Sequence, residues 1–313
     1  MKVVLTGEGS DEIFAGYSFY RIDSLLSDES FRNSSPDTQK KLIGQIINRN
    51  KFFFNSMAQI QKPPSPTDRL FMNSMGFNSY GRSFWKNFSI SQTFIRDDLK
   101  VDPDFVFFSN IPGDIRESMR SRWEPLSTVQ YIENKTLLPN YLLTVLGDRN
   151  EMANSIEARV PFLDHELVDL VNHMPSSVKV HHPEKAGSDL IEKWILKEAA
   201  KPFVTQEIYE RQKHPFLAPP ALFHPNSRLM EWVKERIYSK DMENVSWLDG
   251  KRVKAFADNV ISQVSKAHAN QNGGLNGSLA TGQIDMSDLT MWDSQLLNLA
   301  SIASLQRQFS MSQ

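Results

Sequence analysis

The chain has 313 residues, 40% of them hydrophobic and 23% charged, a composition that is ordinary for a globular protein. Its 35 basic and 37 acidic residues leave a net charge of -2, so we expect no nucleic-acid partner and no electrostatic attraction to acidic membranes. The absence of cysteine excludes disulfides, thiolate metal sites and a cysteine nucleophile. We find no secretory signal and no apolar run near the roughly 18 residues of a membrane span, and therefore expect a cytoplasmic protein.

The first predicted element is a strand over residues 2–5, whose continuous apolar triplet is typical of a strand buried on both faces of a sheet. Gly7 and Gly9 then indicate a tight turn, and Ser10 or Asp11 is a suitable N-cap for a helix that follows. This strand–turn–helix unit is typical of the nucleotide-binding edge of open α/β sheets.

The rest of the chain is predicted to be mainly helical, with weak strand candidates at residues 105–108 and 178–180. Pro139 should begin a new helix. Residues 268–286 are rich in Asn, Gly, Gln and Ser and are predicted to form a mobile linker. Because a strand buried alone cannot satisfy its backbone groups, we expect its neighbours to come from another chain or from preceding sequence. The predicted helices cover residues 37–60, 67–85, 126–146, 165–173, 189–201, 228–238, 250–266 and 287–309.

The turn at residues 6–12 is the first candidate for chemistry, because its glycines let backbone amides approach a phosphate and the next helix directs its positive end there. The carboxylates of Asp11 and Glu12 would oppose an anion unless Mg²⁺ lies between them. The alternative is a purely structural turn, since short glycine motifs are common.

A second candidate stretch, residues 148–164, places several charged side chains among apolar ones, where they are expected to pair or to contact a ligand. A structural reading is equally open here. Glu157 and Arg159 can pair with each other, and Asp164 can cap a helix that begins at His165.

Four segments together resemble the asparagine synthetase family, in the family's order. Residues 6–17 read T-G-E-G-S-D-E-I-F-A-G-Y, similar to the family's S-G-E-G-S-D-E-x-F-x-G-Y, and residues 148–164 match D-R-x-x-M-A-x-S-x-E-x-R-V-P-F-L-D throughout. Residues 192–197 resemble E-K-x-x-L-[KR], and residues 211–219 resemble R-x-K-x-x-F-x-x-P. The resemblance covers residues 1 to about 225 and more weakly the remainder.

This resemblance implies a fold and a reaction. The fold is α/β, the mainly helical C-terminal part of an ATP-pyrophosphatase-type (adenine nucleotide alpha hydrolase-like) domain with one or few strands. The reaction is ATP-dependent adenylation of a carboxylate, by default the β-carboxylate of aspartate, followed by attack of ammonia to form an amide. ATP and Mg²⁺ are the implied cofactors, and glutamine is the implied source of ammonia.

The resemblance also implies residue roles. Glu8 should support adenylate formation and act as the base toward ammonia, and Lys193 should neutralise charge on the phosphates in the transition state. Without the family, helical periodicity would place Lys193 on a solvated face. The residues implied to contact ATP or pyrophosphate are Thr6, Gly7, Gly9, Ser10, Asp148 and Arg149, and those implied to hold Mg²⁺ are Asp11 and Glu12.

Two features of the family are not found in the sequence. The catalytic cysteine of the family's glutaminase domain is absent, and the loop S-G-G-x-D-S that binds pyrophosphate should lie upstream of Thr6. We therefore expect residues 1–267 to form an incomplete synthetase domain, followed by the linker at 268–286 and a C-terminal helix within 287–313. A glutaminase domain or a partner chain supplying the phosphate loop is the expected partner, and the isolated chain is expected to be nearly inactive.

Three hypotheses stay open. The chain can come from a shortened or split gene for an aspartate-amidating enzyme, or it can amidate another carboxylate in a natural-product pathway. A panel of carboxylic acids would separate these two. The third hypothesis is a catalytically inactive partner of a complete synthetase, which ATP–pyrophosphate exchange would distinguish.

Overall fold

The computed structural model describes residues 2–49, 73, 75–77, 79, 91–182, 190–211, 227–269 and 286–311. The chain divides into two compact units. Unit 1 contains residues 1–54, 60–83 and 103–214, and unit 2 contains residues 55–59, 84–102 and 215–313. No helix in the described ranges is both long and apolar enough to cross a membrane.

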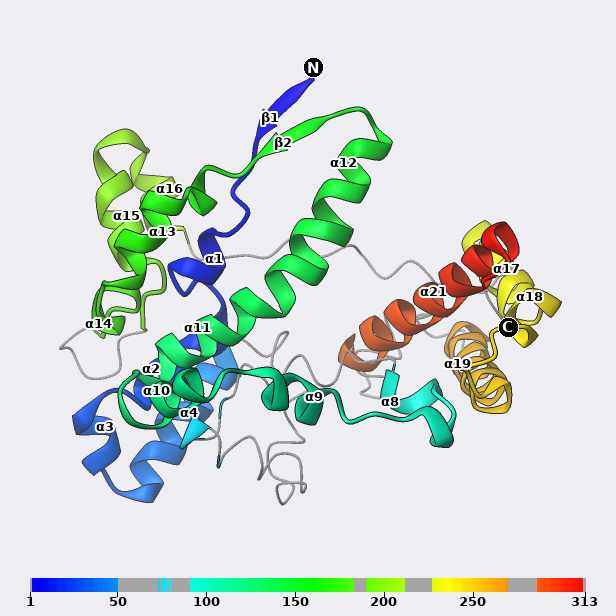
Figure 1. Cartoon of the computed structure of the whole chain (residues 1–313), viewed down its shortest axis with the longest axis horizontal. Helices are drawn as coiled ribbons and strands as arrows, with labels where there is room; N and C mark the ends of the chain where they lie inside the picture. Colours follow the sequence, from blue (N-terminus) through cyan, green and yellow to red (C-terminus); the bar gives the residue numbers. More distant parts are fainter. Residues whose placement is uncertain are drawn as a thin grey trace. The chain divides into compact units, whose positions relative to one another are not determined.

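A two-stranded parallel sheet opens unit 1 (Figure 1). Strand β1 (Val3–Leu5) pairs with β2 (Glu157–Arg159) so that Val4 faces Ala158. The strand predicted at residues 2–5 is thus confirmed. The side chains of Val3 and Leu5 are 49% and 76% exposed in the described structure, so the predicted burial of both strand faces is not seen there.

The expectation that the neighbours of β1 come from another chain or from preceding sequence is wrong for β2, which belongs to the same chain. Strand β2 was not predicted, because residues 157 and 159 were interpreted as a pair of charges. They do form an exposed ion pair, with 2.6 Å between Arg159 Nη2 and Glu157 Oε2. The backbone of the same residues nevertheless extends beside β1, and Thr6 N donates to Arg159 O at 2.9 Å. The segment 148–164 is therefore joined to the start of the chain by backbone hydrogen bonds.

Helix α11 (Pro125–Lys135) supports the segment that follows β1, because it contacts both α1 (Ser10–Ile13) and α2 (Ser18–Leu25). It is followed by the π-helix η3 (Leu138–Asp148) and by α12 (Arg149–Ala153), and the three follow one another along a single rod in Figure 1. Pro139 lies in the first turn of η3, which confirms the prediction that a new helix begins there.

Two predicted strands are wrong. Residues 105–108 lie in helix α9 (Pro103–Asn110), where Pro103 occupies the first helical position, so an apolar run was mistaken for a strand. Residues 178–180 span the end of α14 (Ser176–Lys179), which begins directly after Pro175. A short apolar run does not distinguish a strand from a helix by periodicity alone.

Unit 2 has its own apolar core, built by α17 (Arg228–Ile237), α18 (Lys240–Glu243), α19 (Gly250–Ala269) and α21 (Met286–Phe309). Fully buried side chains such as Met230, Ile237 and Leu296 fill it, and α8 (Ser91–Phe94) adds Phe94. The predicted helices at 228–238, 250–266 and 287–309 are confirmed. Most of the predicted linker, residues 270–285, lies outside the described residues, as does most of the predicted helix at 67–85.

The remaining described elements connect these parts. Helix α4 confirms the first part of the helix predicted at 37–60, and α13 confirms the one predicted at 165–173. The elements are α3 (Glu29–Asn33), α4 (Pro36–Arg49), η2 (Asp97–Leu99), α10 (Gly113–Ser121), η4 (Pro161–Leu163), α13 (His165–Asn172), α15 (Trp194–Ala200), η5 (Lys201–Phe203) and α16 (Gln206–Glu210).

Candidate functional site

The turn between β1 and α1 is closed by Ser10. Its backbone N–H and its hydroxyl both donate to the carbonyl of Gly7, at 3.3 and 2.7 Å. The N-cap of α1 is Gly9, in the left-handed conformation with φ 86°, and not Ser10 or Asp11 as predicted. A left-handed backbone favours glycine, which leaves Ser10 as the first helical residue with its side chain free to tighten the turn.

The second motif segment, residues 148–164, packs directly on this turn. A Cβ added to Gly9 would lie 2.2 Å from Leu163 Cδ2, so the turn and the segment 148–164 fit together only if residue 9 has no side chain. The rings of Phe14 and Phe162 extend this contact edge to face, with centroids 6.1 Å apart. Two segments separated by about 150 residues are thereby held in one place.

Lys193 reaches the same turn from a third segment. Its Nζ lies 2.9 Å from Ser10 Oγ and 2.9 Å from Asp11 Oδ1, and its side chain is only 18% exposed. The predicted helix at 189–201 begins later than expected, at Trp194, and Lys193 is its left-handed N-cap. The solvated face predicted from helical periodicity is therefore wrong, because Lys193 precedes the helix and points toward α1.

Gly16 makes room for this ion pair. A Cβ at residue 16 would lie 2.1 Å from both Asp11 Oδ1 and Lys193 Cε. The backbone N–H of Gly16 also donates to Asp11 O at 2.7 Å, which closes the chain over α1. The glycine at this position thus explains how a lysine and an aspartate can approach each other beside the turn.

On the side of Gly7 the turn is open within the described residues. A Cβ at Gly7 would meet nothing within 4 Å, and Thr6 Oγ1 is buried without a hydrogen-bond partner in the described structure. Glu8 lies half-buried between them and the helix. An unpaired hydroxyl and exposed backbone on a turn that a lysine also contacts are donors that suit a polyphosphate, so these residues fit ATP.

Glu12 points away from this open side. Glu12 is only 1% exposed, and its carboxylate accepts a hydrogen bond from the hydroxyl of Tyr17. Burial raises the pKa of Glu12. Of the two carboxylates predicted to hold Mg²⁺, only Asp11 therefore lies beside Lys193 and the turn.

Glu12 is one of three buried carboxyl groups under the turn. Glu133 on α11 is 3% exposed and Asp23 on α2 is fully buried. Burial, together with the neighbouring Glu12 and Asp23, raises the pKa of Glu133 to about 8. A carboxyl group in such surroundings stays protonated near neutral pH, which lowers the negative charge enclosed there.

Asp148 and Arg149 lie apart from these contacts. Both are exposed where η3 meets α12, and within the described residues neither makes a hydrogen bond or ion pair with the turn. Asp164, in contrast, accepts hydrogen bonds from Glu166 N at 3.0 Å and Leu167 N at 3.4 Å. The alternative stated from the sequence, that Asp164 caps the helix beginning at His165, is confirmed.

The structure adds residues that the motifs did not suggest. The Gln130 side chain donates to the carbonyls of Glu12 and Ile13, at 2.6 and 2.9 Å, and accepts from Lys179 Nζ at 3.2 Å. These bonds fix the end of α1 against α11. The sequence offered one signal for this role, namely that Gln130 is an amide inside the predicted helix at 126–146. Only the structure shows which groups it hydrogen-bonds.

No group of three or more metal-binding side chains of the His, Cys, Asp or Glu type occurs among the residues that the structure describes. A single carboxylate such as Asp11, sharing the ion with phosphate oxygens, is the usual way in which proteins hold Mg²⁺ on a nucleotide. The fourth segment, residues 211–219, lies outside the described residues except for Arg211.

The chain is similar in sequence to several known proteins. Amidase chry2 of Gibberella zeae is 31% identical over 264 residues, covering 84% of this chain and 39% of its own length. Amidase chyE of Penicillium rubens is 34% identical over 254 residues, covering 80% of this chain and 37% of its own length.

A glutamine-hydrolysing asparagine synthetase of Bacillus subtilis is 27% identical over 239 residues, covering 76% of this chain and 34% of its own length. The chain thus spans well under half the length of these relatives. No solved structure matches the chain. The family model described as asparagine synthase matches residues 1–292, and the chain belongs to this family.

Proposed function

We propose that the protein containing this chain forms an amide by ATP-dependent activation of a carboxylic acid as an acyl-adenylate, which ammonia then attacks. The observation that supports this most directly is the position of Lys193, with its Nζ 2.9 Å from both Ser10 Oγ and Asp11 Oδ1. The motif segments at residues 6–17 and 192–197, which are far apart in the sequence, meet at this turn.

In this proposal the open side of the turn receives the nucleotide. Thr6, through its unpaired hydroxyl, and the exposed backbone of Gly7 bind ATP, while Gly9, which is buried against Leu163, and Ser10 shape the turn. Lys193 stabilises the negative charge that develops on the phosphates as the bond to pyrophosphate breaks. Asp11 would hold Mg²⁺, which supplies further positive charge against the pyrophosphate.

Glu8 is the proposed general base. It lies half-buried on the same turn, where a carboxylate can accept the proton that ammonia loses as it attacks the activated carbonyl carbon. Glu12 is left out of the metal site, since its carboxylate is engaged by Tyr17 in the interior. Asp148 and Arg149 stay candidates for the outer edge of the nucleotide site, because both are exposed.

The acyl substrate divides the proposal in two. Aspartate is the default for the family, and the relatives named asparagine synthetases support it. However, the two relatives named amidases share more identical residues with this chain, 31% and 34% against 27%. This difference favours a carboxylic acid other than aspartate as the second candidate substrate.

The source of ammonia is also a proposal. We expect glutamine, hydrolysed by a glutaminase domain or partner, since relatives at 27% identity are named glutamine-hydrolysing. An inactive partner of a complete synthetase is the alternative.

The test is ATP–pyrophosphate exchange by the protein expressed from its own gene in its natural host, assayed with aspartate and with a panel of other carboxylic acids. We expect exchange that depends on one acid, and amide formation that falls by about 10² to 10⁴ in Glu8→Gln. Glu117→Gln, an exposed glutamate on α10, is the matched control and should retain full activity. Absence of exchange with every acid would favour the inactive-partner alternative.

A further inference from the structure

Lys193 has a backbone conformation that residues other than glycine rarely adopt, with φ 51° and ψ 32°. A lysine in this region must be held by its surroundings. The conformation also directs its side chain, because the chain turns at this residue from the extended segment 190–192 into helix α15.

The residues on both sides of Lys193 are fixed. Ile191 forms an antiparallel bridge with His181 through two backbone hydrogen bonds of 2.9 and 3.0 Å. The indole of Trp194 stacks on the imidazole of His181, with ring centroids 4.7 Å apart. These contacts hold the backbone around Lys193, but they do not fix how residues 191–194 are oriented toward α1.

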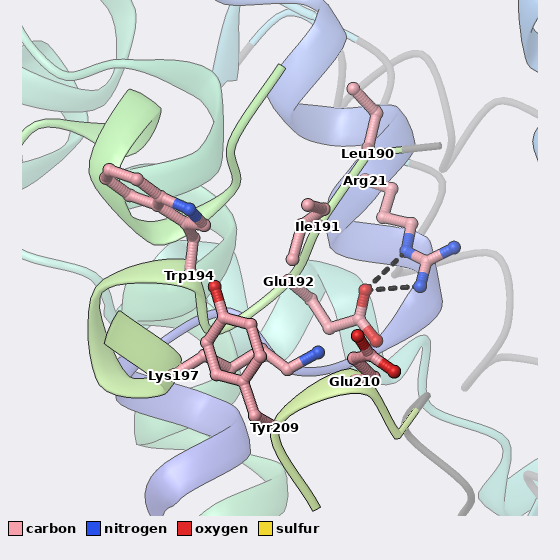
Figure 2. A pocket seen from close by; sticks show the side chains of 8 residues that line it. All are labelled: Arg21, Leu190, Ile191, Glu192, Trp194, Lys197, Tyr209 and Glu210. Atoms are coloured by element: carbon pink, nitrogen blue, oxygen red, sulfur yellow. Dashed lines mark hydrogen bonds and ion pairs between the residues drawn. The ribbon is translucent and has the colours of Figure 1, made fainter. Parts of the chain in front are cut away.

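The third contact supplies this orientation. Arg21 on α2 donates through Nε to Glu192 Oε2 at 2.8 Å, and its Nη2 donates to the same oxygen (Figure 2). Both residues are buried, at 9% and 5% exposure. Glu192 and Lys193 are consecutive in the chain. Glu192 contacts Arg21 on α2, and Lys193 contacts Ser10 and Asp11 on α1, so this short segment is held at two places.

We propose that Arg21 and Glu192 are positioning residues for Lys193. This inference rests on the proposed function, in which Lys193 stabilises charge on the phosphates. The buried ion pair fixes the turn against α2 while the ammonium of Lys193 is held by Ser10 and Asp11 on α1. Because the guanidinium makes two directed bonds, it specifies the orientation of Glu192 as an apolar contact would not.

A cavity of about 260 Å³ lies beside this ion pair, and Arg21 and Glu192 are both among its lining residues. Figure 2 shows the pair among the residues that line the cavity, which include Trp194 and Tyr209. A small guanidinium ion therefore has a route to the space that truncation of Arg21 would leave. This offers chemical rescue as a test.

The experiment measures how fast an amine-specific reagent modifies Lys193, by mass spectrometry of the full chain. In Arg21→Ala and Glu192→Gln we expect Lys193 to react severalfold faster than in the unaltered chain. Lys179, which is 2% exposed, monitors folding and should stay slow. Millimolar methylguanidinium should restore protection in Arg21→Ala, but not in Glu192→Gln, where the carboxylate that receives the ion is missing.

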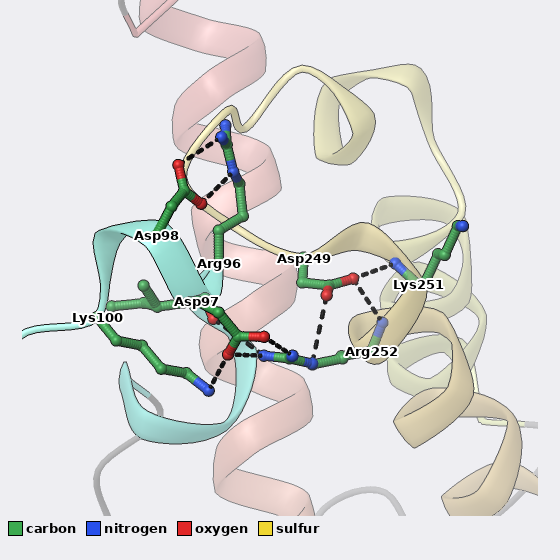
Figure 3. Close-up of polar contacts among 8 residues, drawn as sticks. Arg96, Asp97, Asp98, Lys100, Asp249, Lys251 and Arg252 are labelled. Atoms are coloured by element: carbon green, nitrogen blue, oxygen red, sulfur yellow. Dashed lines mark hydrogen bonds and ion pairs between the residues drawn. The ribbon is translucent and has the colours of Figure 1, made fainter.

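Arg252→Ala is the matched control. Arg252 Nη1 donates to Asp97 Oδ1 at 3.0 Å within unit 2, and both side chains are substantially exposed (Figure 3). This variant removes the same charged group from an ion pair within unit 2, whereas Lys193 belongs to unit 1. We expect Lys193 to react at the original rate in this variant.

Unchanged Lys193 reactivity in both Arg21→Ala and Glu192→Gln would overturn the proposal, whatever the activity. If Lys179 becomes reactive as well, Arg21→Lys decides: it keeps the charge but not the two bonds, and it should expose Lys193 alone. In the active protein the same variants should lower kcat and leave the KM for the acid unchanged. Absence of exchange in the unaltered protein would contradict the proposed function, and the labelling result would still decide the positioning role.

Discussion

Gly16 is the residue whose missing side chain brings Asp11 and Lys193 together. In Gly16→Ala the new methyl group would lie 2.1 Å from Asp11 Oδ1 and Lys193 Cε, so one of them must move. A displacement of about 1 Å at a catalytic group can cost roughly 10²-fold in rate. We therefore expect ATP–pyrophosphate exchange to fall by about that factor.

The control is Gly44→Ala on α4. A Cβ there meets nothing within 4 Å, and alanine in a helix is more stable than glycine by about 0.5–1 kcal/mol. This variant should be slightly stabilised and fully active. Equal activity in Gly16→Ala and the unaltered protein would show that the contact between Asp11 and Lys193 does not serve catalysis.

Single residues also show where sequence reasoning ends. The motif at residues 192–197 identified Lys193, but periodicity placed it on a solvated helix face. Its side chain contacts Ser10 and Asp11, about 180 positions earlier, and a local sequence pattern does not reveal such contacts. The burial of Glu12 was likewise not visible in the sequence, because it depends on the packing of α11 against α1.

At the scale of elements, α13 begins directly after Asp164, the last residue of the family motif. Asp164 accepts hydrogen bonds from two backbone N–H groups of the first turn, so we assign it a structural role. Asp164→Ala should lower the free energy of unfolding by about 1 kcal/mol, and Asp164→Ser should restore most of it, since serine also caps helices. Urea unfolding measures this, and a large loss of activity in Asp164→Ser would instead indicate a catalytic role.

The packing of α2 against α11 makes stability depend on pH. Glu133 has an ordinary pKa of 4.5, and burial raises it to about 8 in the folded chain. Between these values the native state binds more protons than the unfolded state. The free energy of unfolding should therefore fall as pH rises from about 4.5 to about 8, by up to about 1.4 kcal/mol per pH unit from this group.

In Glu133→Gln this titration is removed, and the decline across the same pH range should become shallower. Chemical denaturation at several pH values measures the slope. Glu117→Gln, on the exposed face of α10, should leave the slope unchanged. The same slope in Glu133→Gln and the unaltered chain would contradict the buried, protonated state of Glu133.

Long amphipathic helices were predictable, and short or long-range elements were not. The helices at α13, α17, α19 and α21 follow the 3.6-residue pattern, which local sequence contains. Strand β2 has only three residues and exists through its pairing with β1, more than 150 residues away. Of the candidate site, the motifs named Ser10, Asp11 and Lys193, which the structure brings together, but they did not suggest the hydrogen bonds of Gln130 or the burial of Glu133.

At the scale of the whole molecule, each unit has a separate apolar core. The core of unit 2 is built from its own helices around side chains such as Leu296, Val253 and Met230. In unit 1, Ile13, Phe14 and Val171 form a cluster directly behind the turn. The residues proposed to bind ATP all belong to unit 1, so nucleotide binding should change hydrogen exchange in unit 1 more than in unit 2.

Hydrogen exchange can test this division. Addition of ATP with Mg²⁺ should slow exchange in peptides covering residues 2–17 and 190–200, because the ligand binds the turn and fixes Lys193 against it. Peptides from α17, α19 and α21 should exchange at their original rates, since their amides are protected by a different core. In Gly16→Ala the slowing at residues 190–200 should disappear. Protection confined to unit 2 would place the nucleotide elsewhere and remove the physical basis for assigning Lys193 to the phosphates.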